Sequence, residues 1–187
     1  MKLSFVIPCY NEKNTIRELL SRVLSLDIAP WKKEIIVVDD ASSDGTSDVL
    51  NEFKNKIKLI NLKKNSGKGT AVLSGLAEVT GDYIVIQDAD LEYNPSDICP
   101  MLAIIEKEPS LVIYGSRNIH HEKRSGFIFQ RMGVWAITYL INVFYNQKLT
   151  DVWTCYKVFP VAAKKHFVPG RYEAELLFTT AMVRNGY

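Results

Sequence analysis

Strand-like and helix-like segments alternate through the first half of the chain, and this alternation constrains the fold more than any other feature. Short, mostly apolar runs occupy positions 3–7, 34–38, 57–62 and 83–87. After the first run, apolar residues recur at the spacing of one helix face, at Ile16, Leu19, Leu20, Val23 and Leu24. Strands that alternate with helices form βαβ units with right-handed crossovers. The sequence therefore predicts an α/β fold with a mainly parallel central sheet flanked by helices.

The second half of the chain has a different pattern. A strand-like run at 111–114 precedes a polar stretch at 118–125, an apolar stretch at 133–145 and a final helical pattern that ends near Gly186. With 187 residues and no linker or internal repeat, the chain is expected to form a single domain over 1–187. It ends one aromatic residue beyond a glycine that is typical of a helix C-terminus. We therefore expect the chain to be truncated at its C-terminus.

Composition excludes several classes of protein. The net charge of +2 is too small to indicate nucleic acid as a partner. The three cysteines are odd in number and lack metal-ligand spacing, which favours a reduced, cytoplasmic protein. No stretch reaches the ~20 apolar residues needed to span a bilayer.

The tripeptide Asp88-Ala89-Asp90 directly follows the run at 83–87. The carboxyl edge of a parallel sheet is where open α/β folds bind their ligands. Two carboxylates are costly to hold together there unless a cation lies between them. Hard carboxylate oxygens favour Mg²⁺ or Mn²⁺ shared with a substrate's phosphates. By itself an Asp-x-Asp motif is more often a solvated acidic loop, so the rest of the chain must decide.

Acidic residues also follow the first two predicted strands. Glu12 comes after the first strand, and Asp39 and Asp44 come after the second. Each has a structural alternative, because Glu12 suits a helix start and Asp44 suits a turn or cap. Acids at the ends of three parallel strands converge on one crevice, which favours a shared site.

Four ordered segments carry a family resemblance. They are VIPCYNE (6–12), VVDDASSDGT (37–46), NSGKGTA (65–71) and DADLE (88–92). Together they resemble family 2 glycosyltransferases with the nucleotide-sugar-binding A-type fold, and within them the dolichol- and polyprenyl-phosphate sugar synthases. The resemblance implies a nucleotide-binding half at about 1–117 and an acceptor half at about 118–187.

The resemblance also implies roles on the donor side. Pro8, Tyr10 and Glu12 match a loop that holds base and ribose, and Asp39 matches the acid that reads the base or ribose. Asp88 matches an acid near the ribose and diphosphate, and Asp90 matches the direct metal ligand. Asp88, Asp90 and Glu92 are accordingly the expected ligands of Mg²⁺ or Mn²⁺. Lys68 stands in a glycine-rich turn before a helix, where a structural turn and a direct phosphate contact are equally favoured.

Three further residues are candidates on the acceptor side. Arg117 ends a Gly-Ser-Arg element whose arginine faces phosphates in the resembling subgroup, and Arg131 matches a position linked to the acceptor phosphate. The alternative for either arginine is a surface or ion-paired side chain. Asp151 matches an acid that is the general base in relatives acting on a sugar hydroxyl, and that holds the donor sugar in polyprenyl-phosphate enzymes.

The acceptor is expected to be a polyprenyl phosphate. A hydroxyl nucleophile needs a base, whereas a phosphate monoester is largely a dianion at neutral pH and needs cations instead. Arg117, Arg131 and the basic residues His120, His121, Lys123 and Arg124 suit the second case. Beside them, the apolar stretch 133–145 either lies on a membrane surface or forms a buried core helix.

The resulting hypothesis is an inverting, metal-dependent transferase that moves a sugar from a nucleotide sugar to a dolichyl or undecaprenyl phosphate. UDP-sugars are favoured over GDP-sugars as donors, and a homo-oligomer at the cytoplasmic face of a membrane is expected. One alternative is transfer to a sugar hydroxyl with Asp151 as base. Alternatives from other classes are a nucleotidyltransferase and a non-enzymatic receiver-type domain.

Overall fold

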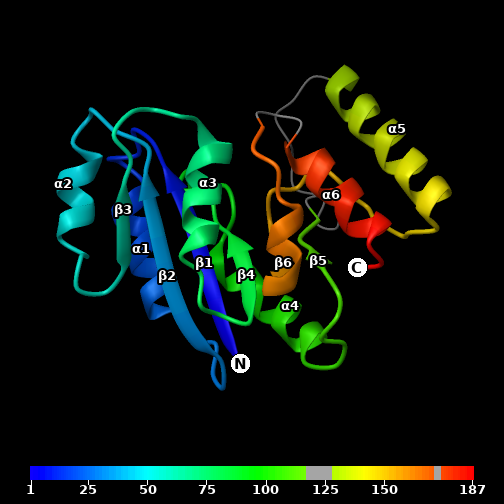
Figure 1. Ribbon diagram of the computed structural model, residues 1–187, viewed down its shortest axis with the longest axis horizontal. Helices are drawn as coiled ribbons and strands as arrows, with labels where there is room; N and C mark the ends of the chain where they lie inside the picture. Colours follow the sequence, from blue (N-terminus) through cyan, green and yellow to red (C-terminus); the bar gives the residue numbers. More distant parts are fainter. Residues whose placement is uncertain (117–127, 171–173) are drawn as a thin grey trace.

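The computed structural model describes residues 1–116, 128–170 and 174–187, which form a six-stranded sheet with helices on both faces (Figure 1). The strands are β1 (Lys2–Cys9), β2 (Lys32–Asp39), β3 (Lys58–Asn61), β4 (Tyr83–Ile86), β5 (Ile113–Tyr114) and β6 (Lys157–Pro160). The α-helices are α1 (Ile16–Ser25), α2 (Thr46–Asn51), α3 (Lys68–Ala77), α4 (Ile98–Ile105), α5 (Ile128–Tyr145) and α6 (Ala174–Arg184). Two 3₁₀ segments are η1 (Pro95–Asp97) and η2 (Val161–His166).

The sheet order is β3-β2-β1-β4-β6-β5. β1 pairs in parallel with both β2 and β4, and β2 pairs in parallel with β3. β6 runs antiparallel to both of its neighbours, β4 and β5. The expectation of an α/β fold with a mainly parallel sheet is therefore confirmed, with one antiparallel strand that the sequence pattern did not reveal. The run predicted as a strand at 111–114 is shorter than expected and pairs only at Ile113 and Tyr114.

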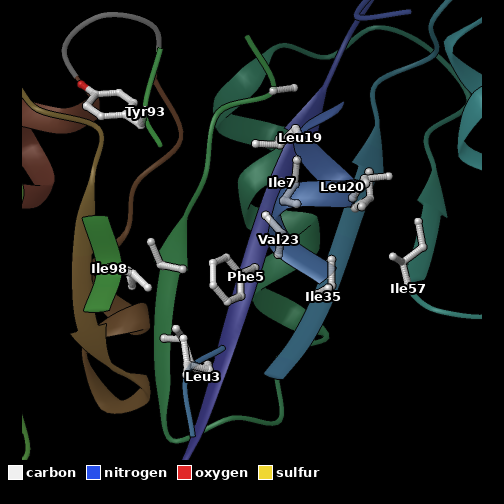
Figure 2. Packing of buried hydrophobic residues seen from close by; sticks show 14 of the residues in the cluster. Leu3, Phe5, Ile7, Leu19, Leu20, Val23, Ile35, Ile57, Tyr93 and Ile98 are labelled. Atoms are coloured by element: carbon white, nitrogen blue, oxygen red, sulfur yellow. The ribbon is translucent and has the colours of Figure 1, made fainter. Parts of the chain in front are cut away.

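Two hydrophobic cores cover the two faces of the sheet. In β1, Phe5 and its alternate neighbours face α1, α2 and α4, whereas Val6 faces α3 and α6. This division follows from the two-residue period of a strand. Figure 2 shows Leu19, Leu20 and Val23 of α1 lying against the first of these faces. A sheet buried on both faces leaves its strand ends as the places where polar groups gather.

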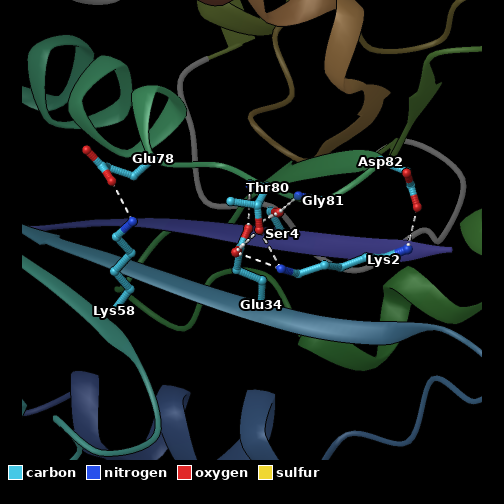
Figure 3. Close-up of polar contacts among 8 residues, drawn as sticks. All are labelled: Lys2, Ser4, Glu34, Lys58, Glu78, Thr80, Gly81 and Asp82. Atoms are coloured by element: carbon cyan, nitrogen blue, oxygen red, sulfur yellow. Dashed lines mark hydrogen bonds and ion pairs between the residues drawn. The ribbon is translucent and has the colours of Figure 1, made fainter.

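A polar network ties the amino-terminal ends of β1 and β2 to the turn before β4 (Figure 3). Glu34 Oε2 accepts hydrogen bonds from Ser4 Oγ (2.5 Å) and the Thr80 backbone N–H (2.9 Å). Glu34 Oε1 accepts one from Lys2 Nζ (2.9 Å). Burial alone would raise the pKa of Glu34, but these hydrogen bonds outweigh it and lower the pKa to about 2. The network therefore holds this end of the sheet with a carboxylate that stays charged.

Helix α5 presents an apolar face to solvent. Ile141 and Thr138 are buried, whereas the exposed side chains are Trp135 (68%), Tyr139 (57%), Leu140 (49%), Val143 (59%) and Phe144 (76%). The alternative that 133–145 is a buried core helix is therefore wrong. Within the described ranges, no helix has both the length and the apolar character required to cross a membrane.

Candidate active site

A cleft of about 370 Å³ opens at the carboxyl-terminal ends of β1, β2 and β4. Six of the residues expected from the sequence line it, namely Pro8, Tyr10, Glu12, Lys68, Asp88 and Asp90. They come from three segments that are far apart in the sequence. They meet because the parallel strands all end at the same edge of the sheet.

The loops that follow β1 and β2 are hydrogen-bonded to each other. The Asn11 N–H donates to Ser42 Oγ (2.9 Å), and the Ser43 N–H donates back to Asn11 Oδ1 (2.9 Å). The Glu12 N–H donates to Thr46 Oγ1 (2.9 Å). Asn11 also adopts a left-handed backbone conformation (φ 56°), which turns the chain sharply after β1. The two loops therefore form one wall of the cleft.

The adjacent carboxylates Asp39 and Asp40 are both 2% exposed but have different partners. Asp39 Oδ1 accepts the Ser42 N–H (3.0 Å), and Asp39 Oδ2 accepts the Ser47 hydroxyl. Asp40 lines the cleft, and Asp39 is not among the lining residues. Neighbouring residues of an extended chain point to opposite sides, so only one of the pair faces the cleft. The sequence analysis named Asp39 and not Asp40, because the pattern does not show which of the two faces the cleft. The role of Asp39 stays a prediction.

Lys68 and Asp88 form an ion pair inside the cleft. Lys68 Nζ lies 2.5 Å from Asp88 Oδ1, with side-chain exposures of 46% and 13%. Lys68 Nζ also donates to Cys155 Sγ (3.5 Å). Burial lowers the pKa of Lys68, but the charge of Asp88 outweighs this and the pKa is raised overall. Burial, followed by the charge of Asp88, raises the pKa of Cys155 to about 12. At neutral pH Lys68 therefore carries a positive charge, and Cys155, which is not among the residues that line the cleft, is a neutral thiol.

The carboxylates expected to bind a metal do not form a complete site by themselves. Across the described part of the chain, no three His, Cys, Asp or Glu side chains come close enough to hold a metal ion. Asp88 and Asp90 line the cleft, whereas Glu92 is exposed, is not among the lining residues and contacts Asp90 Oδ1 through its backbone N–H (3.0 Å). Two carboxylates do fit Mg²⁺ or Mn²⁺, because such ions take their other ligands from water and substrate phosphates.

A second cavity of about 1,040 Å³ adjoins the cleft and shares Lys68 with it. Trp153 and Phe167 give it an aromatic lining, and Glu175 contributes a carboxylate. Lys157, which is 1% exposed, places its Nζ 2.5 Å from Glu175 Oε2. The sequence analysis missed both Lys157 and Glu175. The only signal was a lysine that opens a short apolar run.

The acceptor-side candidates are placed only in part. Arg117 and the basic residues His120, His121, Lys123 and Arg124 lie outside the described residues. Arg131 belongs to α5, but its side chain lies outside the described part. The roles of both arginines therefore stay predictions. Asp151 is 1% exposed, and its Oδ1 accepts the Trp153 N–H at 3.3 Å.

The sequence profile of the family described as glycosyl transferase family 2 matches residues 4–167. The chain belongs to this family. Membership confirms the resemblance carried by the four ordered segments. Membership also excludes the two functions from other classes that the sequence left open, a nucleotidyltransferase and a receiver-type domain.

Relatives of this family 2 glycosyltransferase are named for different products. Dolichol-phosphate mannosyltransferase of Pyrococcus furiosus is 37% identical over 154 residues, which cover 81% of this chain and 43% of that protein. Poly-β-1,6-N-acetyl-D-glucosamine synthase of Staphylococcus epidermidis is 36% identical over 111 residues, which cover 58% of this chain and 26% of that protein. The chain therefore spans less than half the length of these curated relatives.

A solved structure confirms the A-type fold. Glucosyl-3-phosphoglycerate synthase from Mycobacterium tuberculosis, solved with Mn²⁺, UDP and glucosyl-3-phosphoglycerate, superposes with a TM-score of 0.69. The match covers 99% of this chain and 66% of that one, at 21% sequence identity. Because so few residues are identical, the likeness shows the fold alone. The chemistry of this family 2 glycosyltransferase has to be argued from its own residues.

Proposed function

We propose that the chain is the catalytic domain of an inverting, metal-dependent glycosyltransferase that moves a sugar from a nucleoside-diphosphate sugar to a polyprenyl phosphate. The observation that carries the proposal is the gathering of Glu12, Lys68, Asp88 and Asp90 in one cleft at the carboxyl ends of parallel strands. Tyr10, which is 45% exposed, offers an aromatic face for a base at the same cleft. A UDP-sugar is the donor we favour.

On the donor side, Asp90 and Asp88 would hold Mg²⁺ or Mn²⁺. The ion would offset the charge that develops on the leaving diphosphate. Glu12 and the joined loops after β1 and β2 form the wall against which the nucleoside binds. Lys68 adds a fixed positive charge beside Asp88. These residues bind and orient the donor, and none of them needs to exchange a proton with it.

The acceptor phosphate forms the new bond to the anomeric carbon as the bond from that carbon to the diphosphate oxygen breaks. Attack from the side opposite the diphosphate inverts the anomeric configuration. No base is required, because a phosphate monoester with a second pKa of about 6 is already largely a dianion at neutral pH. The site therefore needs cations and a place for a lipid chain.

Two observations favour a lipid phosphate over a sugar hydroxyl as acceptor. The exposed apolar face of α5 provides a surface for a membrane or a prenyl chain. The match to the dolichol-phosphate relative also covers 81% of the chain, against 58% for the polysaccharide synthase. Transfer to a hydroxyl needs a base within reach of the acceptor, and Asp151, the candidate for that role, is 1% exposed.

The test is to incubate the chain and MnCl₂ with radiolabelled UDP-glucose, UDP-N-acetylglucosamine or GDP-mannose, together with undecaprenyl or dolichyl phosphate in detergent. We expect label in the lipid extract, and none with Asp90→Asn as the matched control. Label on an added oligosaccharide instead would favour the hydroxyl acceptor. No transfer with any donor, despite nucleotide binding, would contradict the proposed acceptor.

A further inference from the structure

A carboxylate from β2 holds the turn that leads into α3. Asp40, directly after β2, accepts the Ser66 N–H at Oδ1 and the Gly67 N–H at Oδ2, each at 2.8 Å. The Asp40 N–H in turn donates to the Cys9 carbonyl at the end of β1 (2.8 Å). Asp40 is 2% exposed, so water competes little for these bonds. The turn is therefore anchored to the two strands that form the cleft.

The backbone around this anchor has little freedom. Gly67 has φ 85° and is the N-cap of α3, a conformation that favours glycine. Gly69 packs so closely on the chain that a Cβ there would lie 2.7 Å from the backbone N and O of Gly170. The turn is thus held on one side by Asp40 and on the other by Gly170. Lys68, between the two glycines, is the first residue of α3.

Lys68 directly follows this turn, so the turn sets where the Lys68 side chain starts. It lines both the cleft and the second cavity, and its Nζ lies 2.5 Å from Asp88 Oδ1. A lysine reaches its target through a flexible four-carbon stem, and this one is 46% exposed. The contact with Asp88 holds the ammonium group itself, and the anchored turn keeps the backbone of Lys68 within reach of that contact.

We infer that Asp40 is a positioning residue that acts through Lys68. By fixing the turn, Asp40 keeps the ammonium group at the junction of the two cavities, where it offsets negative charge on the donor's diphosphate. The inference rests on the proposed function, and adds to it a residue that does not itself have to touch the diphosphate.

A double-mutant cycle tests this coupling. The variants are Asp40→Asn, Lys68→Met and the double variant, each titrated with UDP and with GDP in MnCl₂ by calorimetry on the full chain. Loss of a charge-assisted hydrogen bond corresponds to roughly ten- to a hundredfold weaker binding, which we expect for Lys68→Met. Asp40→Asn should also weaken binding, because an amide accepts only at its oxygen and cannot hold both N–H groups. If Asp40 acts through Lys68, the double variant binds within about twofold of Lys68→Met.

Two further variants sharpen the cycle. Asp39→Asn is the matched control, because Asp39 contacts Ser42 and Ser47 rather than the turn. The fold loss in nucleotide affinity of Asp39→Asn/Lys68→Met should therefore be the product of the losses of the two single variants. Gly67→Ala strains the same turn without removing a charge, and a Cβ there meets no atom within 4 Å. The double variant Gly67→Ala/Lys68→Met should therefore bind nucleotide about as tightly as Lys68→Met alone. Gly67→Ala replaces Asp40→Asn if that variant fails to fold.

The outcomes separate this inference from the proposed function. The inference would be overturned, with nucleotide binding left in place, if the affinity loss of the double variant equalled the product of the losses of Asp40→Asn and Lys68→Met. An unchanged affinity in Lys68→Met would overturn it as well. A wild-type chain that binds neither UDP nor GDP would overturn the proposed function, and the inference with it.

Discussion

Lys157 Nζ lies 2.5 Å from Glu175 Oε2, and the two side chains expose only 1% and 12% of their surface. The pair joins β6 to α6 beneath the second cavity. Lys157 Nζ also donates to the Thr154 carbonyl and lies 5.3 Å from the centre of the Tyr114 ring. The ammonium group is therefore fully partnered away from water, and its removal leaves a carboxylate with little compensation.

Breaking this pair should destabilise the protein strongly. Lys157→Met leaves Glu175 as an unpaired, mostly buried charge, and the expected loss in free energy of unfolding is about 3–5 kcal/mol. Urea denaturation followed by circular dichroism measures it. Arg17→Met is the matched control, because its ion pair with Glu52 has side chains 54% and 51% exposed, and such pairs contribute less than about 1 kcal/mol. Similar losses in both variants would show that burial of the Lys157 pair has no consequence.

Asp90→Asn should remove metal-dependent nucleotide binding and leave the fold intact. Asp90 is exposed at the cleft, so the substitution disturbs no packing, but an amide is a weaker ligand for Mg²⁺ or Mn²⁺ than a carboxylate. Calorimetry with UDP, with and without MnCl₂, checks this. Glu92→Gln, beside it, should bind nearly as well as wild type. Unchanged affinity in Asp90→Asn would contradict its role as metal ligand.

Stability should fall in acid through Glu34. The pKa of Glu34 is lowered from 4.5 to about 2 in the folded protein, so its contribution is fully present above pH 4.5 and is lost as the pH falls toward 2. A shift of this size corresponds to at most about 3 kcal/mol. Unfolding free energies of wild type and Glu34→Gln should therefore differ near pH 7 and converge near pH 2. A constant difference over this range would show that the charge of Glu34 is not the cause.

The exposed face of α5 should bind lipid. Burial of one large apolar side chain contributes roughly 1.5–3 kcal/mol, so the double variant Trp135→Ser/Phe144→Ser should bind phospholipid vesicles at least about tenfold more weakly in sedimentation assays. UDP affinity should stay unchanged. Leu177→Ser on α6, where the native side chain is 48% exposed, is the control for a general loss of surface apolarity. Equal losses in both variants would mean that α5 has no special role.

Much of the structure of residues 1–116 could be predicted from the sequence, because the signals there are local. The apolar runs that became β1, β2 and β4 are recognisable by composition alone. The carboxylates at their ends meet for a simple reason, since parallel strands end at one edge of a sheet. The gathering of Glu12, Asp88 and Asp90 in one cleft follows from this rule.

The remainder depends on contacts that the sequence does not show. β6 is four residues long, begins with the charged Lys157 and ends at Pro160, so it has no pattern typical of a strand. Lys157 can be buried there only because Glu175 approaches from α6. Likewise, Asp40 lines the cleft and accepts hydrogen bonds from the turn at residues 65–68, a contact between segments far apart in the sequence.

The place of β6 in the sheet has a consequence for how the chain emerges from the ribosome. β4 is complete once residue 86 has been made, but the strand that covers its open edge is β6, which ends at Pro160. Until then one edge of β4 carries unpaired backbone groups, which readily pair with another chain. The edge of β4 is therefore synthesised early but is covered late. A nascent chain that stalls before β6 should associate with other chains or recruit a chaperone at that edge.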